Sequence, residues 1–499
     1  MKSLFTIAVL ALACIACEPA DRPTAQASLP PITIDPATDA TPGTFVHLFE
    51  WRWDDIAQEC EAFLGPKGYT GVQVSPPLEH ARVDGSPWWD RYQPASYDIN
   101  TRSGDRAAFA DMVQRCDAVG VGVYVDAILN HMTGAERRES ITGRRFGAYD
   151  YPGLYSYEDF HHCGLTDGDE INNWNDRTQV RTCELVNLAD LATGKENVRD
   201  TLAAYLDDLA SLGVAGIRID AARHMAPEDI AAILDRMEGT LEVFQEVIDP
   251  APPTWSEEYY PMGRVTEFQF SSVLSDVFYN GPLARLHGDG SIWETVPFIP
   301  GDEALVFIDN HDNQRGHGAG GHIVMHNDGA LHTLAMGFML AYPYGQPRVM
   351  SSYRFEDDAQ GPPRLADGST KPVHAGDALN CAQGEWVCEH RQPEVAGMVD
   401  FRRVTHGAPV AAWWTDGDNQ IAFAREARGF VALNRSDATM TQMLPTTLPA
   451  GTYCDVTQGG LIEGACGGRS VTINAEGEAA IDLEPMTMLG LHVDARLAD

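Results

Sequence analysis

A regular alternation of strand and helix patterns, which begins at residue 44, restricts the possible folds of this chain more than any other feature. Short apolar runs rich in β-branched residues are separated by segments whose apolar residues recur at helical spacing. The expected strands are, in order, TFVHLFEW, YTGVQVSPP, VGVYVDAILNH, VAGIRIDAARH, LEVFQEVID, RVTEFQF, ALVFIDNHD and RVMSSY. Eight short strands separated by helical stretches predict an α/β fold, the (β/α)8 TIM barrel.

The helical segments carry boundary signals of their own. Asp54 is expected to cap the first helix, because its side chain can accept a hydrogen bond from a free backbone N–H. Pro227 and Gly239 are expected to open and close a later helix. The helix between the second and third strands should bury the apolar residues of one face, Phe109, Met112, Val113 and Cys116.

Two segments depart from this alternation. Residues 131–189 are rich in Gly, Tyr, Asp, Asn and His, and they are far too long for an ordinary connection. They predict a small domain inserted after the third strand, between the barrel segments 44–130 and 190–407. From residue 408 to residue 499, short strand-like segments such as QIAFARE and GFVALNR alternate with turn residues, which predicts an all-β sandwich domain.

The N-terminus has the pattern of an export signal. A lysine precedes an apolar run that is too short to span a membrane, so residues 1–17 are expected to be a signal peptide. Residues 18–43, rich in Pro, Ala, Thr and Asp, read as a flexible tether. The start resembles that of a bacterial lipoprotein, although neither Cys17 nor Cys14 has Leu three residues before it. Two outcomes stay open, namely plain secretion and a lipid anchor on Cys17 or Cys14.

Composition excludes some partners and one type of metal site. The formal net charge of −37 argues against nucleic acid, because phosphate binding needs clustered Lys and Arg. Such a charge suits a neutral substrate without identifying it. Apart from Cys14 and Cys17, an even number of cysteines remains, which favours disulfides in an exported chain, and their spacing fits no zinc site.

Acidic residues end three of the expected strands, at the end of the barrel where active sites lie. The fourth strand ends in Asp220, the fifth in Glu246 and the seventh in Asp312. Because side chains alternate along a strand, Arg218 should share a face with Asp220, and Asn310 with Asp312. A single strand-end carboxylate is more often solvated or paired in a salt bridge. Three that converge suit glycoside hydrolysis, in which one attacks the anomeric carbon and another protonates the leaving oxygen.

The chain also resembles the α-amylase family of glycoside hydrolases, in particular its animal-type, chloride-dependent group. The matching motifs include HLFEWRW, PWWDRYQP, VYVDAILNHM, VAGIRIDAARHM, FQEVID, FIDNHDNQRGHGAGG and RVMSSYRF. The resemblance implies endo-hydrolysis of α-1,4-glucosidic bonds in starch, glycogen and maltooligosaccharides, with retention of configuration. It implies that Asp220 is the nucleophile, Glu246 the general acid/base and Asp312 the third carboxylate, which supports the transition state. Glu246 must then carry a proton when Asp220 attacks.

The resemblance implies a set of substrate contacts as well. Trp88, Trp89 and Tyr92 would form an aromatic platform for the apolar faces of pyranose rings, although ordinary surface aromatics are the alternative. The further substrate-binding positions are Gln93, Asp126, His131, Arg218, Arg223, His224, His311 and His317. Arg223 stands where the family usually has Lys, which puts the affinity of that subsite in doubt. The glycine-rich residues 316–322 are expected to form a lid.

A chloride site is implied at Arg218, Asn310 and Arg348. A buried arginine needs a partner, and two arginines with an amide could form an anion pocket. Chloride would screen Glu246 from the arginines and so keep it protonated for acid catalysis. The alternative left open is a salt bridge from Arg218 to a carboxylate such as Glu246.

A calcium site is implied at the side chains of Asn130 and Asp190 and at the backbone carbonyls of Arg181 and His224. Calcium prefers oxygen ligands of these kinds, and the ion would pin the inserted domain to the barrel. The residues alone support this site weakly, because scattered Asn and Asp are mostly caps and turns.

The implied disulfides are Cys60–Cys116, Cys163–Cys183, Cys381–Cys388 and Cys454–Cys466. A further bridge of the animal group, between the barrel and the inserted domain, is not expected, because Asn100 occupies one of its positions. A monomer is expected. The competing functions are a transglycosylating or maltooligosaccharide-forming relative, and a starch-binding lipoprotein without catalysis.

Overall fold

The computed structural model describes residues 43–134, 136–249, 255–318, 321–376, 378–381 and 384–498. The expected signal peptide, residues 1–17, and all of the expected tether before residue 43 lie outside these ranges, as do Cys14 and Cys17. Among the described residues, no helix combines the length and the apolar character needed to cross a membrane.

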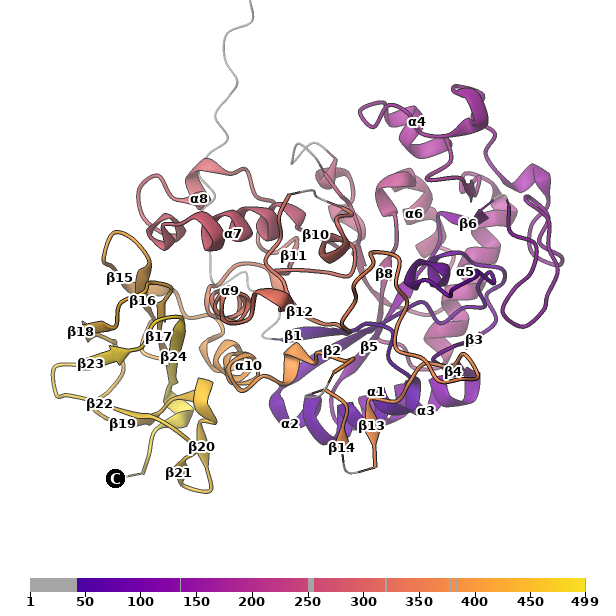
Figure 1. The fold of residues 1–499 in the computed structure, drawn as a ribbon. Helices are drawn as coiled ribbons and strands as arrows, with labels where there is room; N and C mark the ends of the chain where they lie inside the picture. The colour runs from indigo at the N-terminus through magenta and orange to yellow at the C-terminus, as the bar shows by residue number, and fades with distance from the viewer. Residues whose placement is uncertain are drawn as a thin grey trace, which may run out of the picture. The chain divides into compact units, whose positions relative to one another are not determined.

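Eight parallel strands close into a barrel in the order β1-β12-β11-β10-β9-β8-β5-β2 (Figure 1). Their bounds are β1 (Thr44–Leu48), β2 (Tyr69–Val74), β5 (Gly122–Ala127), β8 (Gly216–Ile219), β9 (Glu242–Gln245), β10 (Arg264–Thr266), β11 (Ala304–Val306) and β12 (Gln346–Ser351). Strand β1 completes the circle, because Phe45 lies opposite both Gly71 of β2 and Arg348 of β12. The predicted TIM barrel is confirmed.

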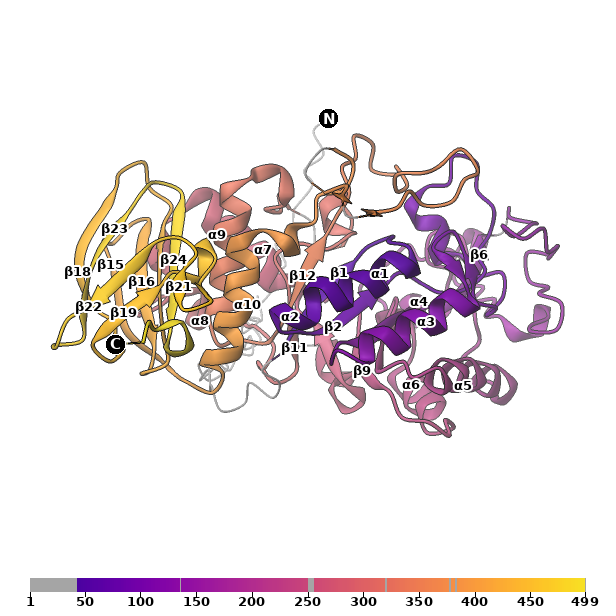
Figure 2. The same ribbon diagram turned by 90° about the horizontal axis from the view of Figure 1, so that it is seen from below.

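Helices cover the outside of the barrel. They are α1 (Trp53–Glu59), α2 (Gly65–Lys67), α3 (Arg106–Asp117), α5 (Glu196–Ser211), α6 (Pro227–Leu234), α7 (Phe268–Asn280), α8 (Ile292–Thr295), α9 (Ala330–Ala341) and α10 (Pro393–Thr405). Helices α1 and α3 lie side by side (Figure 2), and α3 buries the four residues predicted for it.

Three details of the predicted elements are wrong. Asp54 does not cap α1: the helix follows Arg52, whose guanidinium donates to the Asp54 carboxylate at 2.9 and 2.8 Å. Helix α6 ends at Leu234, before Gly239. The segment RVTEFQF is a strand only as far as β10, because the Glu267 side chain accepts the N–H of Gln269 and so starts α7.

The chain between β5 and α5 has little regular structure. Strands β6 (His131–Gly134) and β7 (Leu188–Asp190) pair antiparallel, with His131 opposite Asp190. A single α-helix, α4 (Arg177–Thr182), lies between them in the described part of this segment. The disulfide Cys163–Cys183 ties the end of α4 to the loop before it.

Two four-stranded antiparallel sheets form the C-terminal part of the chain, which confirms the predicted all-β domain. One sheet contains β15 (Val410–Thr415), β16 (Gln420–Arg425), β17 (Gly429–Asn434) and β24 (Thr487–His492). The other contains β18 (Met440–Pro445), β19 (Gly451–Cys454), β22 (Ser470–Ile473) and β23 (Glu478–Leu483). Side chains of both sheets, such as Phe430 and Ile481, share one core, so the sheets form a sandwich.

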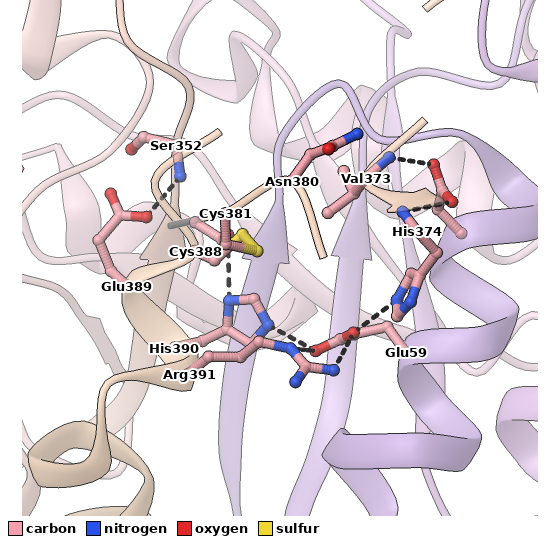
Figure 3. The surroundings of a disulfide bond; sticks show 12 residues. Glu59, Ser352, Val373, His374, Asn380, Cys381, Cys388, Glu389, His390 and Arg391 are labelled. Carbon is pink, nitrogen blue, oxygen red and sulfur yellow. Dashed lines mark hydrogen bonds and ion pairs between the residues drawn. A yellow bond between two sulfur atoms is a disulfide. The ribbon is translucent and has the colours of Figure 1, made fainter. Parts of the chain in front are cut away.

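A buried carboxylate fixes the long segment that follows β12. Glu59, at the end of α1, lies between the rings of His374 and His390, with Nε2 atoms at 2.8 and 2.9 Å (Figure 3). Arg391 donates to the same carboxylate from Nε at 2.6 Å. The Cys381–Cys388 disulfide closes a loop between His374 and His390. The disulfides Cys60–Cys116 and Cys454–Cys466 are formed as well.

Candidate active site

A cavity of about 760 Å³ opens beside the carboxyl ends of the barrel strands, and Asp220, Glu246 and Asp312 all line it. Asp220 comes directly after β8 and Glu246 directly after β9, so the barrel itself positions both. The other predicted residues that line this cavity are Trp88, Trp89, Tyr92, Gln93, His131, His311 and His317. The structure therefore brings together carboxylates that are far apart in the chain.

Arg218 of β8 connects the carboxylates at the base of this cavity. Its Nη1 donates to Asp126 at 2.5 Å and to Asp220 at 2.8 Å. Its Nη2 lies 2.5 Å from Oε1 of Glu246 and 4.0 Å from Oδ2 of Asp312. The predicted proximity of Arg218 to Asp220 is confirmed, and Asp126 joins the same cluster.

Burial and crowding make this cluster bind protons tightly. Burial raises the pKa of Asp220 well above its ordinary value, the charges of Glu246 and Asp126 add to this, and Arg218 opposes it. Burial and the neighbouring Glu246 raise the pKa of Asp312 to about 7. One guanidinium cannot balance several carboxylates, so the cluster retains a proton near neutral pH.

The residues around Asp312 do not follow the predicted alternation. Strand β11 ends at Val306, so Asn310 and Asp312 belong to a turn and not to a strand. The side chain of Asn310 accepts the backbone N–H groups of Asp312, at 3.0 Å, and of Asn313, at 2.8 Å. Its amide oxygen thus shapes the turn that carries Asp312 to the cavity.

The two other polar residues of this turn point in different directions. Asp309 binds Gln314 Nε2 at 2.6 Å and lies 3.1 Å from His332 Nε2, within the protein. His311 lines the cavity and stacks on Tyr92, with ring centroids 5.3 Å apart. Burial lowers the pKa of His311 well below its ordinary value, so this imidazole is neutral at neutral pH.

The residues predicted as an aromatic platform lie in a 3-10 turn, Trp88–Tyr92. Trp88 donates from Nε1 to the carbonyl of Asp358 at 2.8 Å, and its ring meets that of Tyr92 edge to face at 5.8 Å. The Tyr92 hydroxyl donates to Asp126 at 2.9 Å. His131 is held against the Tyr92 carbonyl at 3.0 Å, and burial lowers the pKa of His131 to about 4.

A second cavity of about 470 Å³ also borders Glu246. The predicted residues Arg223, His224 and His317 line it, together with Trp174. Sequence reasoning missed Trp174, because it lies in a segment without periodicity or motif. Only the placement of α4 beside the barrel brings it to Glu246.

Of the three residues predicted for chloride, Arg218 and Arg348 lie close enough for their charges to interact. Arg348 donates to Gln73 at 2.7 Å, and burial and repulsion by Arg218 lower the pKa of Arg348 to about 10. Arg218 itself is paired with carboxylates, which is the alternative that the sequence left open. Asn310 uses its oxygen in the turn, so only its amide nitrogen could donate to an anion.

Two of the residues predicted for calcium, Asn130 and Asp190, lie where β6 and β7 meet. Asn130 and Asp190 are both buried, and their side chains are hydrogen-bonded to each other. Asp190 also lies 2.6 Å from Nδ1 of His161. His224 Nδ1 is 3.1 Å from the carbonyl of Val180, the neighbour of Arg181. The described residues hold no cluster of three or more His, Cys, Asp or Glu suited to a metal, so a cation here would bind the single carboxylate of Asp190 together with amide and carbonyl oxygens.

Comparison with known proteins identifies relatives over nearly the whole chain. Residues 63–246 match the family described as alpha amylase, catalytic domain, and residues 414–494 match alpha amylase, C-terminal all-beta domain. The chain is 46% identical to alpha-amylase 1B of Homo sapiens over 491 residues, which covers 91% of this chain and 95% of the relative. It is 44% identical to pancreatic alpha-amylase of Rattus norvegicus over 502 residues, covering 93% and 97%.

Solved structures give the same result. The crystal structure of alpha-amylase I from Eisenia fetida matches with a TM-score of 0.85 and 41% identity, over 90% of this chain and 97% of that one. A mutant of that enzyme in complex with maltohexaose matches with a TM-score of 0.82 and 40% identity, over the same shares.

Proposed function

Because the chain belongs to the α-amylase family of glycoside hydrolases, we propose that it is an endo-acting α-amylase that cleaves α-1,4-glucosidic bonds of starch, glycogen and maltooligosaccharides with retention. The observation that carries this proposal is the geometry around Arg218. Asp220 and Glu246 bind the two Nη atoms of one planar guanidinium, in a cavity that has an aromatic wall. Retention requires two carboxyl groups in such close proximity.

The proposed reaction has two steps. Asp220, whose ionised form Arg218 favours, attacks the anomeric carbon while Glu246 gives its proton to the leaving glycosidic oxygen. Water then attacks the ester on Asp220, and Glu246 takes the proton from that water. Asp312 and the neutral imidazole of His311 bind the sugar between these carboxylates and the aromatic platform, Trp88–Tyr92.

We propose chloride as a cofactor because two buried guanidiniums, those of Arg218 and Arg348, repel each other. Arg218, Arg348 and the amide nitrogen of Asn310 would hold the ion. When bound, chloride supplies a negative charge that weakens the attraction of the arginines for the catalytic carboxylates.

We propose calcium for the oxygen donors of Asn130 and Asp190 and the carbonyls of Arg181 and His224. Burial raises the pKa of Asp190 to about 7 although His161 opposes the shift, so a positive charge beside this carboxyl group would stabilise its ionised form. When bound, the ion supplies that charge and links β6 and β7 to the segments that contain α4 and His224.

The remaining proposals concern the whole chain. The apolar run and the cysteines near the N-terminus support export, either by secretion or with a lipid on Cys17 or Cys14. We propose a monomer with a barrel of residues 44–130 and 190–407, an inserted domain of residues 131–189 and a C-terminal domain of residues 408–499.

A reducing-sugar assay on soluble starch tests the activity. Glu246→Gln should lower kcat by about two to four orders of magnitude while maltooligosaccharide binding survives. Glu426→Gln, an exposed change in the C-terminal sandwich, is the matched control. An inactive wild-type chain that binds starch would indicate a binding protein. Chromatography of products from the active chain separates hydrolysis from transglycosylation or release of one maltooligosaccharide.

A further inference from the structure

Arg315 is a buried arginine at the end of the turn that carries Asp312, and it has no role in the proposed reaction. It is 2% exposed and lines neither the main cavity nor the second one. Its Nη1 donates to the backbone carbonyl of His311 at 2.7 Å, and its backbone N–H donates to the carbonyl of Asp312 at 2.9 Å. Arg315 therefore holds both residues of this turn that line the main cavity.

Four aromatic rings contact the guanidinium of Arg315. Its central carbon lies 4.1 Å from the ring centroid of Phe355, 5.1 Å from that of Tyr353, 5.3 Å from that of Phe49 and 5.5 Å from that of Trp88. Aromatic faces attract a cation, so these rings offset part of the cost of burying the charge. We call these four aromatic residues the arginine cage.

The arginine cage joins the loops that follow four consecutive strands of the barrel. Trp88 lies in the loop after β2, and Phe49 comes directly after β1. Tyr353 and Phe355 follow β12, and Arg315 itself follows β11. These strands are neighbours in the order β2-β1-β12-β11. A single guanidinium thus links the turn of the third carboxylate to the loops of the three strands on one side of it.

Phe49 connects the arginine cage to the cavity. Its ring stacks on that of His311 with centroids 4.9 Å apart, and His311 stacks in turn on Tyr92 at 5.3 Å. The ring of Trp88, which also belongs to the cage, meets that of His311 edge to face at 5.4 Å. A displaced guanidinium would therefore move the imidazole of His311 and the indole of Trp88 relative to each other.

We propose that Arg315 is a positioning residue for Asp312 and His311, and that the arginine cage fixes these two residues relative to Trp88. This inference rests on the proposed function, in which Asp312 and His311 bind the sugar that reacts. Groups at the reacting sugar must be placed accurately in the transition state, and a displacement of about 1 Å can cost about 100-fold in rate. Loss of the guanidinium should therefore lower kcat more than it raises KM.

Steady-state kinetics with maltopentaose, measured well below the Tm of each variant, test the role of Arg315. Arg315→Gln should lower kcat by about 10- to 100-fold and change KM by less than about threefold. Arg315→Lys should stay at least about fivefold below the wild-type kcat, because an ammonium lacks the planar fork that stacks and donates at once. Arg354→Gln, a change of an exposed arginine outside both cavities, is the matched control. A lowered Tm with wild-type kcat in Arg315→Gln would overturn the positioning role.

A double-mutant cycle with Phe355 tests the arginine cage, because the Phe355 ring is the nearest to the guanidinium and lines neither cavity. Phe355→Leu should lower kcat by about two- to fivefold, and this loss should be absent in the Arg315→Gln background. Arg315→Lys serves the same cycle if Arg315→Gln does not fold. Additive effects, or wild-type kcat in Phe355→Leu, would overturn the cage. A wild-type chain without starch hydrolysis would instead overturn the proposed function, and this inference with it.

Discussion

Arg218 binds Glu246 directly, with Nη2 2.5 Å from Oε1, and it holds Asp126 and Asp220 through Nη1. Three buried carboxylates thus share one buried cation. The negative charge in excess attracts a proton, and the pKa values of Asp126, Asp220 and Asp312 are all raised. In this arrangement the retained proton belongs to the whole cluster and not to one carboxyl group.

Removing one negative charge should weaken the hold of the cluster on its proton. Burial is the main cause of the raised pKa values of Asp220 and Asp312, and the charge of Asp126 adds to both. In Asp126→Asn the shared proton is therefore lost at lower pH, and the alkaline limb of the kcat/KM–pH profile should move down by about half to one pH unit. Measurement of kcat/KM across pH 5–9 checks the shift. An unchanged or raised limb would contradict a shared proton.

Removal of chloride should also move the alkaline limb of the kcat/KM–pH profile to lower pH. Without the anion, the charges of Arg218 and Arg348 act fully on the carboxylates, favour their ionised forms, and lower activity at neutral and alkaline pH. Arg348→Gln removes one of the two cations, so its activity should respond much less to added chloride. Initial rates in buffers of equal ionic strength with chloride or acetate measure this. Equal chloride responses of variant and wild type would argue against the site.

Removal of calcium should destabilise the segment between β5 and α5. A chelator should lower Tm by about 5 °C or more, because an ion that binds the folded state alone stabilises it. In Asp190→Asn, which lacks the carboxylate ligand, the chelator should have little effect. Asp150→Asn, an exposed change in the same segment, should respond as the wild type does. A chelator effect of the same size in Asp190→Asn would place the ion elsewhere.

The elements that were predicted correctly are those whose pattern depends on one buried face. Helix α3 buries Phe109, Met112, Val113 and Cys116 because their spacing leaves no other face to bury. The prediction from strand alternation was wrong at Asp312, because Asn310, four residues beyond the end of β11, starts a hydrogen-bonded turn. Local side-chain to backbone bonds of this kind compete with the strand and carry no periodic signal.

The contacts that Arg223 makes with distant segments could not be predicted from the sequence, for a different reason. Trp174 and Trp255 carry no motif, yet Arg223 donates to the backbone carbonyl of Trp174 at 2.9 Å, and its guanidinium lies 4.5 Å from the centroid of the Trp255 ring. The resemblance pointed to Arg223 as a departure from the family, but the partner that makes an arginine suitable lies in another loop. Pairing of this kind depends on tertiary packing, which a single sequence does not encode in any local pattern.

Glu59 should contribute far more to stability than a neighbouring carboxylate on the surface. Although burial raises the pKa of Glu59, its bonds to His374, His390 and Arg391 outweigh burial and hold this pKa well below its ordinary value (Figure 3). Its stabilisation is therefore complete above the unfolded-state pKa and is lost only as pH falls through the folded-state value.

At pH 7, Glu59→Gln leaves Arg391 and two buried imidazoles without their carboxylate, and it should cost about 3–5 kcal/mol in the free energy of unfolding. Glu61→Gln is the matched control, because Glu61 pairs with Arg115 on the surface at 2.8 and 2.6 Å, and an exposed pair of this kind contributes about 0–1 kcal/mol. Denaturant unfolding of both variants measures the difference. Equal destabilisation would mean that the Glu59 cluster is no stronger than a surface ion pair, and that the segment after β12 is held mainly by the Cys381–Cys388 disulfide and apolar packing.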